Sequence, residues 1–199
     1  MTRLIAIAGP SGAGKTTLTR HLARHLPGST LHLPLDAYYR DLSRLPLEAR
    51  HHFNFDEPAA LDLDLLVGNL TALAQGQAVD KPVYLFPEHL RAPAPERVEP
   101  GDWVLVEGLF ALYWAEVRRL CHTRIFVNAP DELCLERRLA RDTVERGRTR
   151  ESILEQYTRQ VRPMCQQHLL PTRAFADLVL DGAQPVELMA TPLLARLDQ

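Results

Sequence analysis

The sequence contains little cysteine and little lysine. Its three cysteines, Cys121, Cys134 and Cys165, are odd in number and form no CxxC pair, which argues against a disulfide framework or a zinc site and favours a reducing compartment. Of the 23 lysine and arginine residues, only those at positions 15 and 81 are lysines. An ammonium is a compact point charge and a guanidinium a planar fork, so each lysine indicates a position where the smaller head matters. A codon bias of the genome explains the arginine excess equally well.

Long apolar runs and a strong net charge are also missing. The longest apolar stretch, residues 103–114, is interrupted by Glu107 and is shorter than the roughly 20 residues that span a bilayer. The N-terminus enters a strand pattern at once, without the anatomy of a signal peptide. The formal net charge is -2, so the chain lacks the excess of positive charge that is typical of nucleic-acid-binding proteins. We therefore expect a cytoplasmic protein that binds neither membrane nor nucleic acid.

Short apolar runs alternate with segments of helical spacing. Strands are predicted at 4–8, 29–33, 103–106, 123–127 and 178–180, and helices at 15–26, 57–75, 131–145 and 150–169. The polar and aromatic stretch 36–55 predicts a long loop with some helix, and the proline-rich stretch 79–100 a hairpin-like excursion. This alternation predicts an α/β fold with an open parallel sheet covered on both faces. Length and a hydrophobic fraction of 46% indicate one domain over residues 1–199.

A phosphate-binding motif follows the first predicted strand. Residues 9–16 (GPSGAGKT) fit G-x-x-x-x-G-K-[ST] without a gap. Small residues let consecutive backbone N–H groups turn toward phosphate oxygens, and the helix that begins at Lys15 adds its positive end. We expect Lys15 to reach the β- and γ-phosphates of ATP and Thr16 to ligate Mg²⁺. The predicted contacts are Gly9, Ser11, Gly12, Ala13, Gly14, Lys15, Thr16 and Thr17. A chance glycine-rich turn is the alternative, and the position between a buried strand and a helix argues against it.

A second acid for the phosphate site ends a later strand. Glu107 closes the apolar run that begins at Trp103, at the edge where open α/β sheets bind ligands. An unpaired carboxylate there is costly, so we expect a role near Mg²⁺; a structurally satisfied acid is the alternative. No guanine-reading N-K-x-D and no L-S-G-G-Q transporter signature occurs, and the chain is short for a motor or helicase. A small kinase remains.

Further motifs carry a resemblance to one family. They are 35–41 (LDAYYRD), 54–58 (NFDEP), 81–84 (KPVY), 106–108 (VEG), 137–148 (RRLARDTVERGR), 156–157 (QY) and 161–164 (VRPM), with Phe86, His89 and Arg91. With the P-loop, this ordered set resembles the uridine kinase (uridine–cytidine kinase) family from Gly9 to about Asp181. The resemblance implies transfer of the ATP γ-phosphate to the 5′-hydroxyl of uridine or cytidine.

The resemblance also implies roles for residues of the predicted nucleoside region, about 36–100. A ribose 5′-hydroxyl needs a carboxylate to take its proton, and Asp36 is the implied base and a candidate Mg²⁺ ligand; a turn-forming aspartate is the alternative. Asp56 is assigned to the ribose hydroxyls, and Tyr84 and His89 to the base, where an imidazole donates or accepts. Tyr38 joins the substrate contacts. Leu85 departs from the family, whose members often have aspartate there.

An arginine-rich segment around Gly147 resembles a lid, about 138–156. Phosphoryl transfer needs cations around the equatorial oxygens, and the resemblance assigns Arg141, Arg146 and Arg148 to the phosphates. It assigns Arg138 and Gln156 to the nucleoside. The alternative is a solvated face with ion pairs at helical spacing, which we favour for Arg137 and Arg150.

We therefore predict a Mg²⁺- and ATP-dependent pyrimidine ribonucleoside kinase with Asp36, Lys15 and Arg141 as catalytic residues. The resemblance also implies a homo-oligomer, a tetramer by family precedent. The nearest rival is a related P-loop kinase that acts on nicotinamide riboside, pantothenate or ribulose phosphate. A second rival is a nucleotide-binding regulator that keeps the fold without turnover. The uridine-to-cytidine preference, the preferred donor and feedback inhibition by pyrimidine triphosphates stay open.

Overall fold

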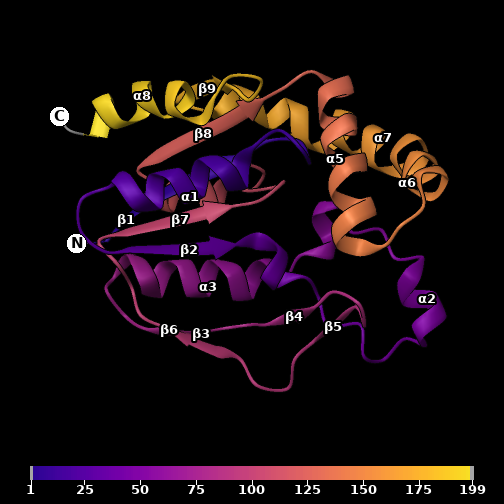
Figure 1. Ribbon diagram of the computed structural model, residues 1–199. Coiled ribbons are helices and arrows are strands. Elements are labelled where there is room, and N and C mark those ends of the chain that lie inside the picture. Colours follow the sequence, from indigo (N-terminus) through magenta and orange to yellow (C-terminus); the bar gives the residue numbers. More distant parts are fainter. Residues whose placement is uncertain (1, 198–199) are drawn as a thin grey trace.

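A five-stranded parallel sheet forms the centre of the molecule. The computed structural model describes residues 2–197, without the side chains of His51, Arg146 and Leu197. The strand order is β2 (Thr30–Pro34), β7 (Trp103–Glu107), β1 (Arg3–Ala8), β8 (Thr123–Asn128) and β9 (Leu178–Asp181) (Figure 1). All four neighbouring pairs are parallel. The predicted open parallel sheet is confirmed.

Helices cover both faces of this sheet. α1 (Lys15–His25) contacts α8 (Val186–Leu197), and α3 (Leu63–Ala74) contacts α4 (Ala115–Leu120). The predicted helix at 57–75 begins later, because Asp62 caps α3 by accepting a hydrogen bond from the backbone N–H of Leu65, while Pro58–Ala60 forms a separate 3₁₀ turn. The sequence pattern missed α4 and α8. The loop predicted at 36–55 holds a 3₁₀ turn, Leu35–Tyr38, and α2, Leu47–His51.

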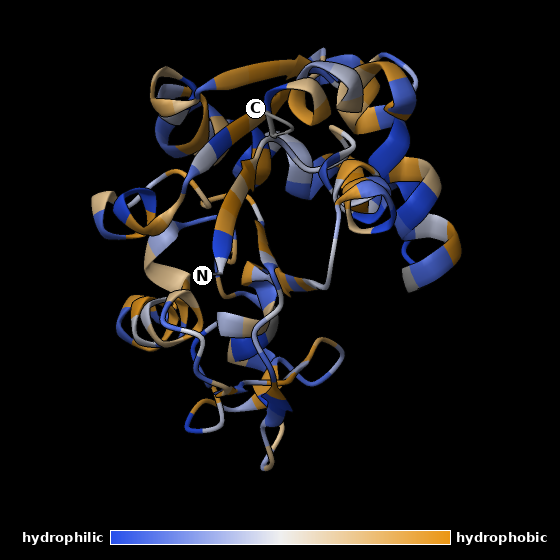
Figure 2. Ribbon diagram, turned by 90° about the vertical axis from the view of Figure 1, so that its left-hand side faces the viewer, coloured by the Kyte–Doolittle hydropathy of each residue, from blue (hydrophilic) through white to orange (hydrophobic). Residues whose placement is uncertain are grey.

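The alternation of side chains along the strands produces two hydrophobic cores. Along β1, Leu4 and Ala6 belong to the core that contains Leu66 of α3, whereas Ile5 and Ile7 belong to the core on the α1 side. β7 and β8 divide their side chains in the same way, and the central strands carry mostly the hydrophobic colour in Figure 2. A strand buried on both faces needs no polar alternation, which is why these runs are continuous in sequence.

The proline-rich stretch forms the predicted hairpin excursion below the sheet in Figure 1. β3 (Val79–Lys81) pairs antiparallel with β6 (Glu96–Val98). Further along the same excursion β4 (Tyr84–Leu85) pairs antiparallel with β5 (Leu90–Arg91). The hairpin therefore brings Tyr84 and His89 to one place.

The arginine-rich segment lies beyond the carboxyl ends of the strands, where the arrowheads of β1 and β7 point in Figure 1. α5 (Asp131–Arg146) ends at Gly147, whose φ is 60°, and α6 (Arg150–Gln156) follows. The chain continues through π-helical Tyr157–Val161, α7 (Arg162–Met164), π-helical Cys165–Leu169 and 3₁₀ Leu170–Phe175. The backbone is αR at each of these junctions up to Leu170, so the helix predicted at 150–169 is present as a helical stretch with two π-helical parts. These parts flank Pro163, which cannot donate a helical hydrogen bond. Within residues 2–197, no helix has both the length and the apolar character needed to cross a membrane.

Candidate active site

The P-loop connects β1 to α1 through glycines that no other residue can replace without strain. Gly9 and Gly12 have φ values of 148° and 85°, in the left-handed region. A Cβ atom on Gly9 would lie 2.3 Å from the Val127 carbonyl oxygen, and one on Gly12 would lie 2.5 Å from that of Cys134. The loop is thus pressed against the end of β8 and the start of α5.

The first turn of α1 offers its backbone N–H groups to an anion. Its N-cap, Gly14, makes no side-chain cap hydrogen bond, and the first turn contains no acidic residue. Uncapped N–H groups and the helix dipole together form an anion site. The Lys15 ammonium folds back over the loop and donates to the Pro10 carbonyl oxygen at 2.9 Å.

Two carboxylates act on Lys15, which is only 8% exposed. Burial lowers the pKa of Lys15, and the negative charges of Glu107 and Asp36 counteract this by raising it. Both carboxylates therefore lie within electrostatic reach of the Lys15 ammonium. This is the arrangement that the predicted phosphate site requires.

Glu107 and Thr16 place two oxygen atoms side by side at the end of β7. The Thr16 hydroxyl donates to Glu107 Oε2 at 3.2 Å, and His32 Nε2 lies 3.3 Å from the same oxygen. Burial raises the pKa of Glu107, but the His32 contact, the Lys15 charge and the Thr16 hydrogen bond outweigh it and hold the pKa below its usual value. A hydroxyl and an ionised carboxylate suit Mg²⁺, which keeps most of its ligands as water and phosphate oxygens. Among the described residues, no group of three or more His, Cys, Asp or Glu side chains is arranged to hold a metal ion.

A cavity of about 1390 Å³ joins the P-loop to the hairpin and to α5. It brings together most of the predicted site residues: Ser11, Gly12, Gly14, Lys15, Thr16, Thr17, Asp36, Asp56, Tyr84, His89, Glu107, Arg138, Arg141, Arg148 and Gln156. Gly9 and Ala13 belong to the same loop but do not line the cavity. The predicted contact through the Arg146 side chain lies outside the described part of the chain.

Tyr38 does not reach the cavity, and its neighbour Tyr39 does. The Tyr38 ring is fully buried, and its hydroxyl accepts a hydrogen bond from Asn69 on α3 at 3.1 Å. Tyr39 lines the cavity. Burial, the charges of Asp36 and Asp56, and a hydrogen bond to Asp36 raise the pKa of the Tyr39 phenol well above its usual value. Tyr39 thus replaces Tyr38 as the residue beside the predicted base.

Aromatic side chains from two segments form one wall of the cavity. The His89 ring stacks on Phe55 with centroids 5.0 Å apart, and Tyr84 meets Phe86 edge to face at 5.4 Å. His89 has a positive φ of 52°, a conformation that is uncommon outside glycine and often marks functional positions. The Tyr84 hydroxyl is buried and has no hydrogen-bond partner among the described residues. Leu85 alternates to the opposite side of β4 and does not line the cavity.

The arginines of α5 and of the segment after it make polar contacts within the protein. The Gln156 side-chain oxygen accepts from Arg138 at 3.0 Å and from Arg148 at 2.7 Å. Asp142, which is fully buried, pairs with Arg141 at 2.8 Å and with Arg138 at 3.4 Å. The interpretation of Arg137 as a solvated surface residue is wrong. Its guanidinium lines the cavity and donates to the carbonyl oxygens of Gly12 and Gly182.

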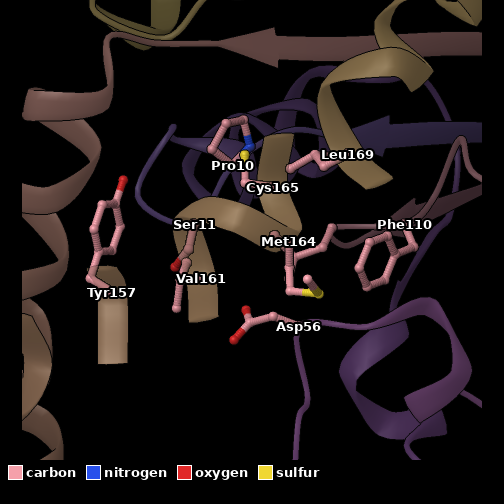
Figure 3. Close-up of a pocket in the computed structure, with 10 residues that line it drawn as sticks. Pro10, Ser11, Asp56, Phe110, Tyr157, Val161, Met164, Cys165 and Leu169 are labelled. Carbon is pink, nitrogen blue, oxygen red and sulfur yellow. The ribbon is translucent and has the colours of Figure 1, made fainter. Parts of the chain in front are cut away.

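A second, small cavity lies behind Asp56. It measures about 20 Å³, enough for about one water molecule. Figure 3 shows Asp56 on one side and Val161, Met164 and Cys165, from the helical stretch 157–169, on the other. Burial raises the pKa of Asp56, the Arg138 charge lowers it, and the Asp36 charge raises it, so the net pKa is above the usual value. Only the larger cavity has room for a nucleoside.

The comparisons with known proteins agree with this geometry. The family model described as "Phosphoribulokinase / Uridine kinase family" matches residues 4–188. The chain belongs to this family. It is 42% identical to a uridine kinase from Chloroflexus aggregans, over 98% of this chain and 94% of that protein. It is 44% identical to a uridine kinase from Deinococcus deserti, over 89% of this chain and 86% of that one. These findings confirm the predicted family and the phosphotransferase class.

Solved structures support the fold. Phosphoribulokinase from Rhodobacter spheroides superposes with a TM-score of 0.65 at 17% identity, over 93% of this chain and 74% of that chain. D-glycerate 3-kinase from Cryptococcus neoformans superposes with a TM-score of 0.61 at 17% identity, over 84% and 78%. The predicted P-loop kinase fold is confirmed. Sequence reasoning assigned no site role to His32, Tyr39, Arg137 and Asp142, which contact predicted site residues, or to Phe55 and Phe86, which line the cavity.

Proposed function

We propose that this kinase transfers the γ-phosphoryl group of ATP to the 5′-hydroxyl of uridine and cytidine. One observation carries the proposal: a single cavity contains the P-loop lysine, the Asp36 carboxylate and an aromatic wall with a buried Tyr84 hydroxyl that has no hydrogen-bond partner in the described part of the chain. Native proteins leave few buried polar groups unpaired, so this hydroxyl is suited to a polar atom of the bound base. The uridine kinase relatives support the same substrate class.

The nucleoside is held at its two ends in this proposal. Asp56 accepts hydrogen bonds from the ribose hydroxyls, and Arg138 and Gln156 lie on the same side of the cavity. Tyr84 and His89 face the base, where a hydroxyl and an imidazole can each donate or accept. That dual capacity suits both the O4 of uridine and the N4 of cytidine. The 5′-hydroxyl then lies toward Asp36, which takes its proton as the oxygen attacks phosphorus.

The triphosphate lies across the N-terminus of α1. Lys15 and the loop amides hold the β- and γ-phosphates, while Arg141 and Arg148 approach from α5 and the segment after it. We propose that Thr16 and Glu107 would hold Mg²⁺, with Asp36 of the same cavity as a further candidate ligand; the ion would supply positive charge to the phosphate oxygens. The same arrangement orients the γ-phosphoryl group toward Asp36.

A substrate panel tests the proposal. The purified protein is expected to consume ATP with uridine or cytidine and to show no comparable turnover with nicotinamide riboside, pantothenate or ribulose phosphate. Turnover with one of the latter alone would establish the related-kinase alternative. ATP binding without turnover of any acceptor would establish the regulator.

The raised pKa of Asp56 predicts that kcat/KM for the nucleoside falls on the acid side of its pH profile, which is called the acid limb. A raised pKa means that the carboxylate gains its proton at a higher pH than an ordinary aspartate, and the protonated form cannot accept both ribose hydroxyls. We expect kcat/KM for uridine to fall as the pH drops through this pKa, because KM rises. Arg138 lowers the pKa of Asp56, so Arg138→Gln is expected to move the limb to higher pH. The measurement is the profile of kcat/KM for uridine from about pH 4 to 8 in both proteins. If the acid limb does not move in Arg138→Gln, a group other than Asp56 causes it.

A further inference from the structure

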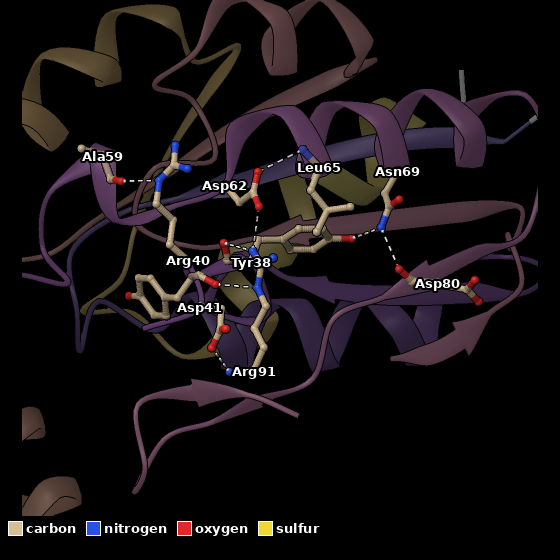
Figure 4. Close-up of polar contacts among 10 residues, drawn as sticks. Tyr38, Arg40, Asp41, Ala59, Asp62, Leu65, Asn69, Asp80 and Arg91 are labelled. Carbon is tan, nitrogen blue, oxygen red and sulfur yellow. Dashed lines mark hydrogen bonds and ion pairs between the residues drawn. The ribbon is translucent and has the colours of Figure 1, made fainter. Parts of the chain in front are cut away.

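Arg91 links the hairpin to the segment that carries Asp36. It lies on β5, directly opposite Tyr84 of β4. Its side chain is 19% exposed and leaves the hairpin toward the Asp36 segment and the start of α3 (Figure 4). Its backbone N–H donates to Asp41 at 3.3 Å. Arg91 does not line the cavity, so any effect that it has on the reaction passes through its neighbours.

The guanidinium binds three acceptors in that segment. Nε donates to the Tyr39 carbonyl oxygen at 2.8 Å, and Nη2 donates to the Tyr38 carbonyl oxygen at 3.2 Å. Nη2 also lies 3.1 Å from Asp62 Oδ2. These carbonyls follow Asp36 by two and three residues. The Arg91 side chain therefore fixes the backbone immediately after the proposed base.

The other side of the same segment is fixed by α3. Asp62 uses its second oxygen to cap the helix at Leu65 and its backbone N–H to donate to the Tyr38 carbonyl at 2.9 Å. Asn69 holds the Tyr38 hydroxyl from the next turns of the helix. Figure 4 shows these contacts converging on the Tyr38 backbone and ring. The segment has little freedom to move relative to either α3 or the hairpin.

We infer that Arg91 is a positioning residue that sets the separation between the aromatic wall of the hairpin and the Asp36 carboxylate. The inference rests on the proposed function, because it concerns a substrate that touches both. Tyr84 is opposite Arg91 on the hairpin, and Tyr39, whose carbonyl Arg91 holds, borders Asp36 in the cavity. A nucleoside bound by its base at Tyr84 then presents its 5′-hydroxyl at a fixed distance from Asp36.

The chemistry explains why arginine stands here. A planar fork with several N–H donors can satisfy two carbonyls and a carboxylate in one geometry, whereas a lysine ammonium is a single point. The two chain segments are far apart in sequence, since Arg91 lies 52 residues after Tyr39. Without the fork, the remaining links between the hairpin and the Asp36 segment include the bond from the Arg91 backbone N–H to Asp41 and the edge contact of Tyr39 with Tyr84, and neither of them holds the backbone directly after Asp36.

Arg91→Lys tests the inference because it keeps the charge and removes the fork. We expect kcat/KM for uridine to fall about 10- to 100-fold, as a misplaced reacting group does, with ATP-analogue affinity and melting temperature close to those of the unmodified protein. Asp62→Asn is the second variant; Asn still caps α3 but weakens the Arg91 contact, and a smaller loss of the same kind is expected. Arg97→Lys is the matched control on the same hairpin, since Arg97 and its partner Asp80 are 60% and 59% exposed.

A double-variant cycle with Tyr84→Phe separates positioning from a general structural role. If Arg91 acts by aligning Tyr84 with Asp36, removal of the Tyr84 hydroxyl costs less in the Arg91→Lys background than in the unmodified protein. Additive losses would overturn the inference. So would a loss that appears equally in ATP-analogue affinity and melting temperature, because that pattern indicates general destabilisation.

The outcomes distinguish this inference from the proposed function. Turnover of uridine by the unmodified protein with unchanged kinetics in Arg91→Lys and Asp62→Asn overturns the role of Arg91 alone. If Arg91→Lys does not fold, Asp62→Asn decides the result. No turnover of uridine or cytidine by the unmodified protein overturns both.

Discussion

An Asp36→Asn variant is expected to lose about 100- to 10,000-fold of its turnover with uridine while it binds ATP as the unmodified protein does. The amide has the same size as the carboxylate and still accepts the hydrogen bond of Tyr39, so the local geometry is kept. It cannot take the proton of the 5′-hydroxyl. The loss therefore falls on kcat, and single-turnover kinetics with radiolabelled ATP measure it.

The matched control for this prediction is Asp64→Asn. Asp64 lies in the first turn of α3, is exposed and does not line the cavity. Its variant is expected to keep the turnover of the unmodified protein within about twofold, as distant surface changes usually do. If Asp36→Asn also kept turnover within that range, Asp36 would not be the base, and another group would take the proton of the 5′-hydroxyl.

The sequence predicted those parts of the site that depend on strand ends and on consecutive residues. The P-loop could be predicted because the glycines, the lysine and the following helix form one continuous segment. Glu107 could be placed because it ends a buried strand. Its side chain points to the same face of β7 as those of Trp103 and Leu105, which pack on the α1 side, so it meets Thr16 of α1. Both predictions use local geometry that tertiary contacts do not alter.

Tyr38 shows where such reasoning ends. Two adjacent tyrosines follow Asp36, and the segment has neither a period of 2 nor one of 3.6. The 3₁₀ turn at Leu35–Tyr38 directs the first ring into the core toward Asn69 and leaves the second for the cavity. Only the contact with α3 decides between the two rings. Sequence spacing alone could not supply it.

His32 and Asp142 were missed for different reasons. His32 stands between Leu31 and Leu33 on an edge strand, and this alternation puts it on the face of Glu107, so a parity argument could have found it. Asp142 follows Arg138 at helical spacing, which is also typical of a solvated surface pair. Its complete burial depends on α6 and the segment after it, and burial of that kind is not encoded in the spacing.

Lys15→Met is expected to lower turnover about 100- to 1000-fold, the usual cost of one donor to the charge that develops in the transition state. Lys15 is 8% exposed, and its ammonium is already oriented over the loop by the Pro10 carbonyl, so the charge that Met removes is a buried and positioned one. ATP-analogue affinity is expected to fall less than turnover, because the loop amides and the N-terminus of α1 remain. Steady-state kinetics and titration calorimetry separate the two effects.

Two further variants decide whether charge or shape matters at this position. Lys15→Arg keeps the charge but brings a larger planar head into a closed space, and we expect it to lose at least about tenfold in turnover. Lys81→Met makes the same chemical change at the second lysine, which pairs with Glu96 at 2.8 Å on the hairpin and does not line the cavity; it is expected to stay near the unmodified value. Full turnover in Lys15→Arg would mean that charge alone suffices, and the survival of a lysine here in an arginine-rich chain would then carry no chemical meaning.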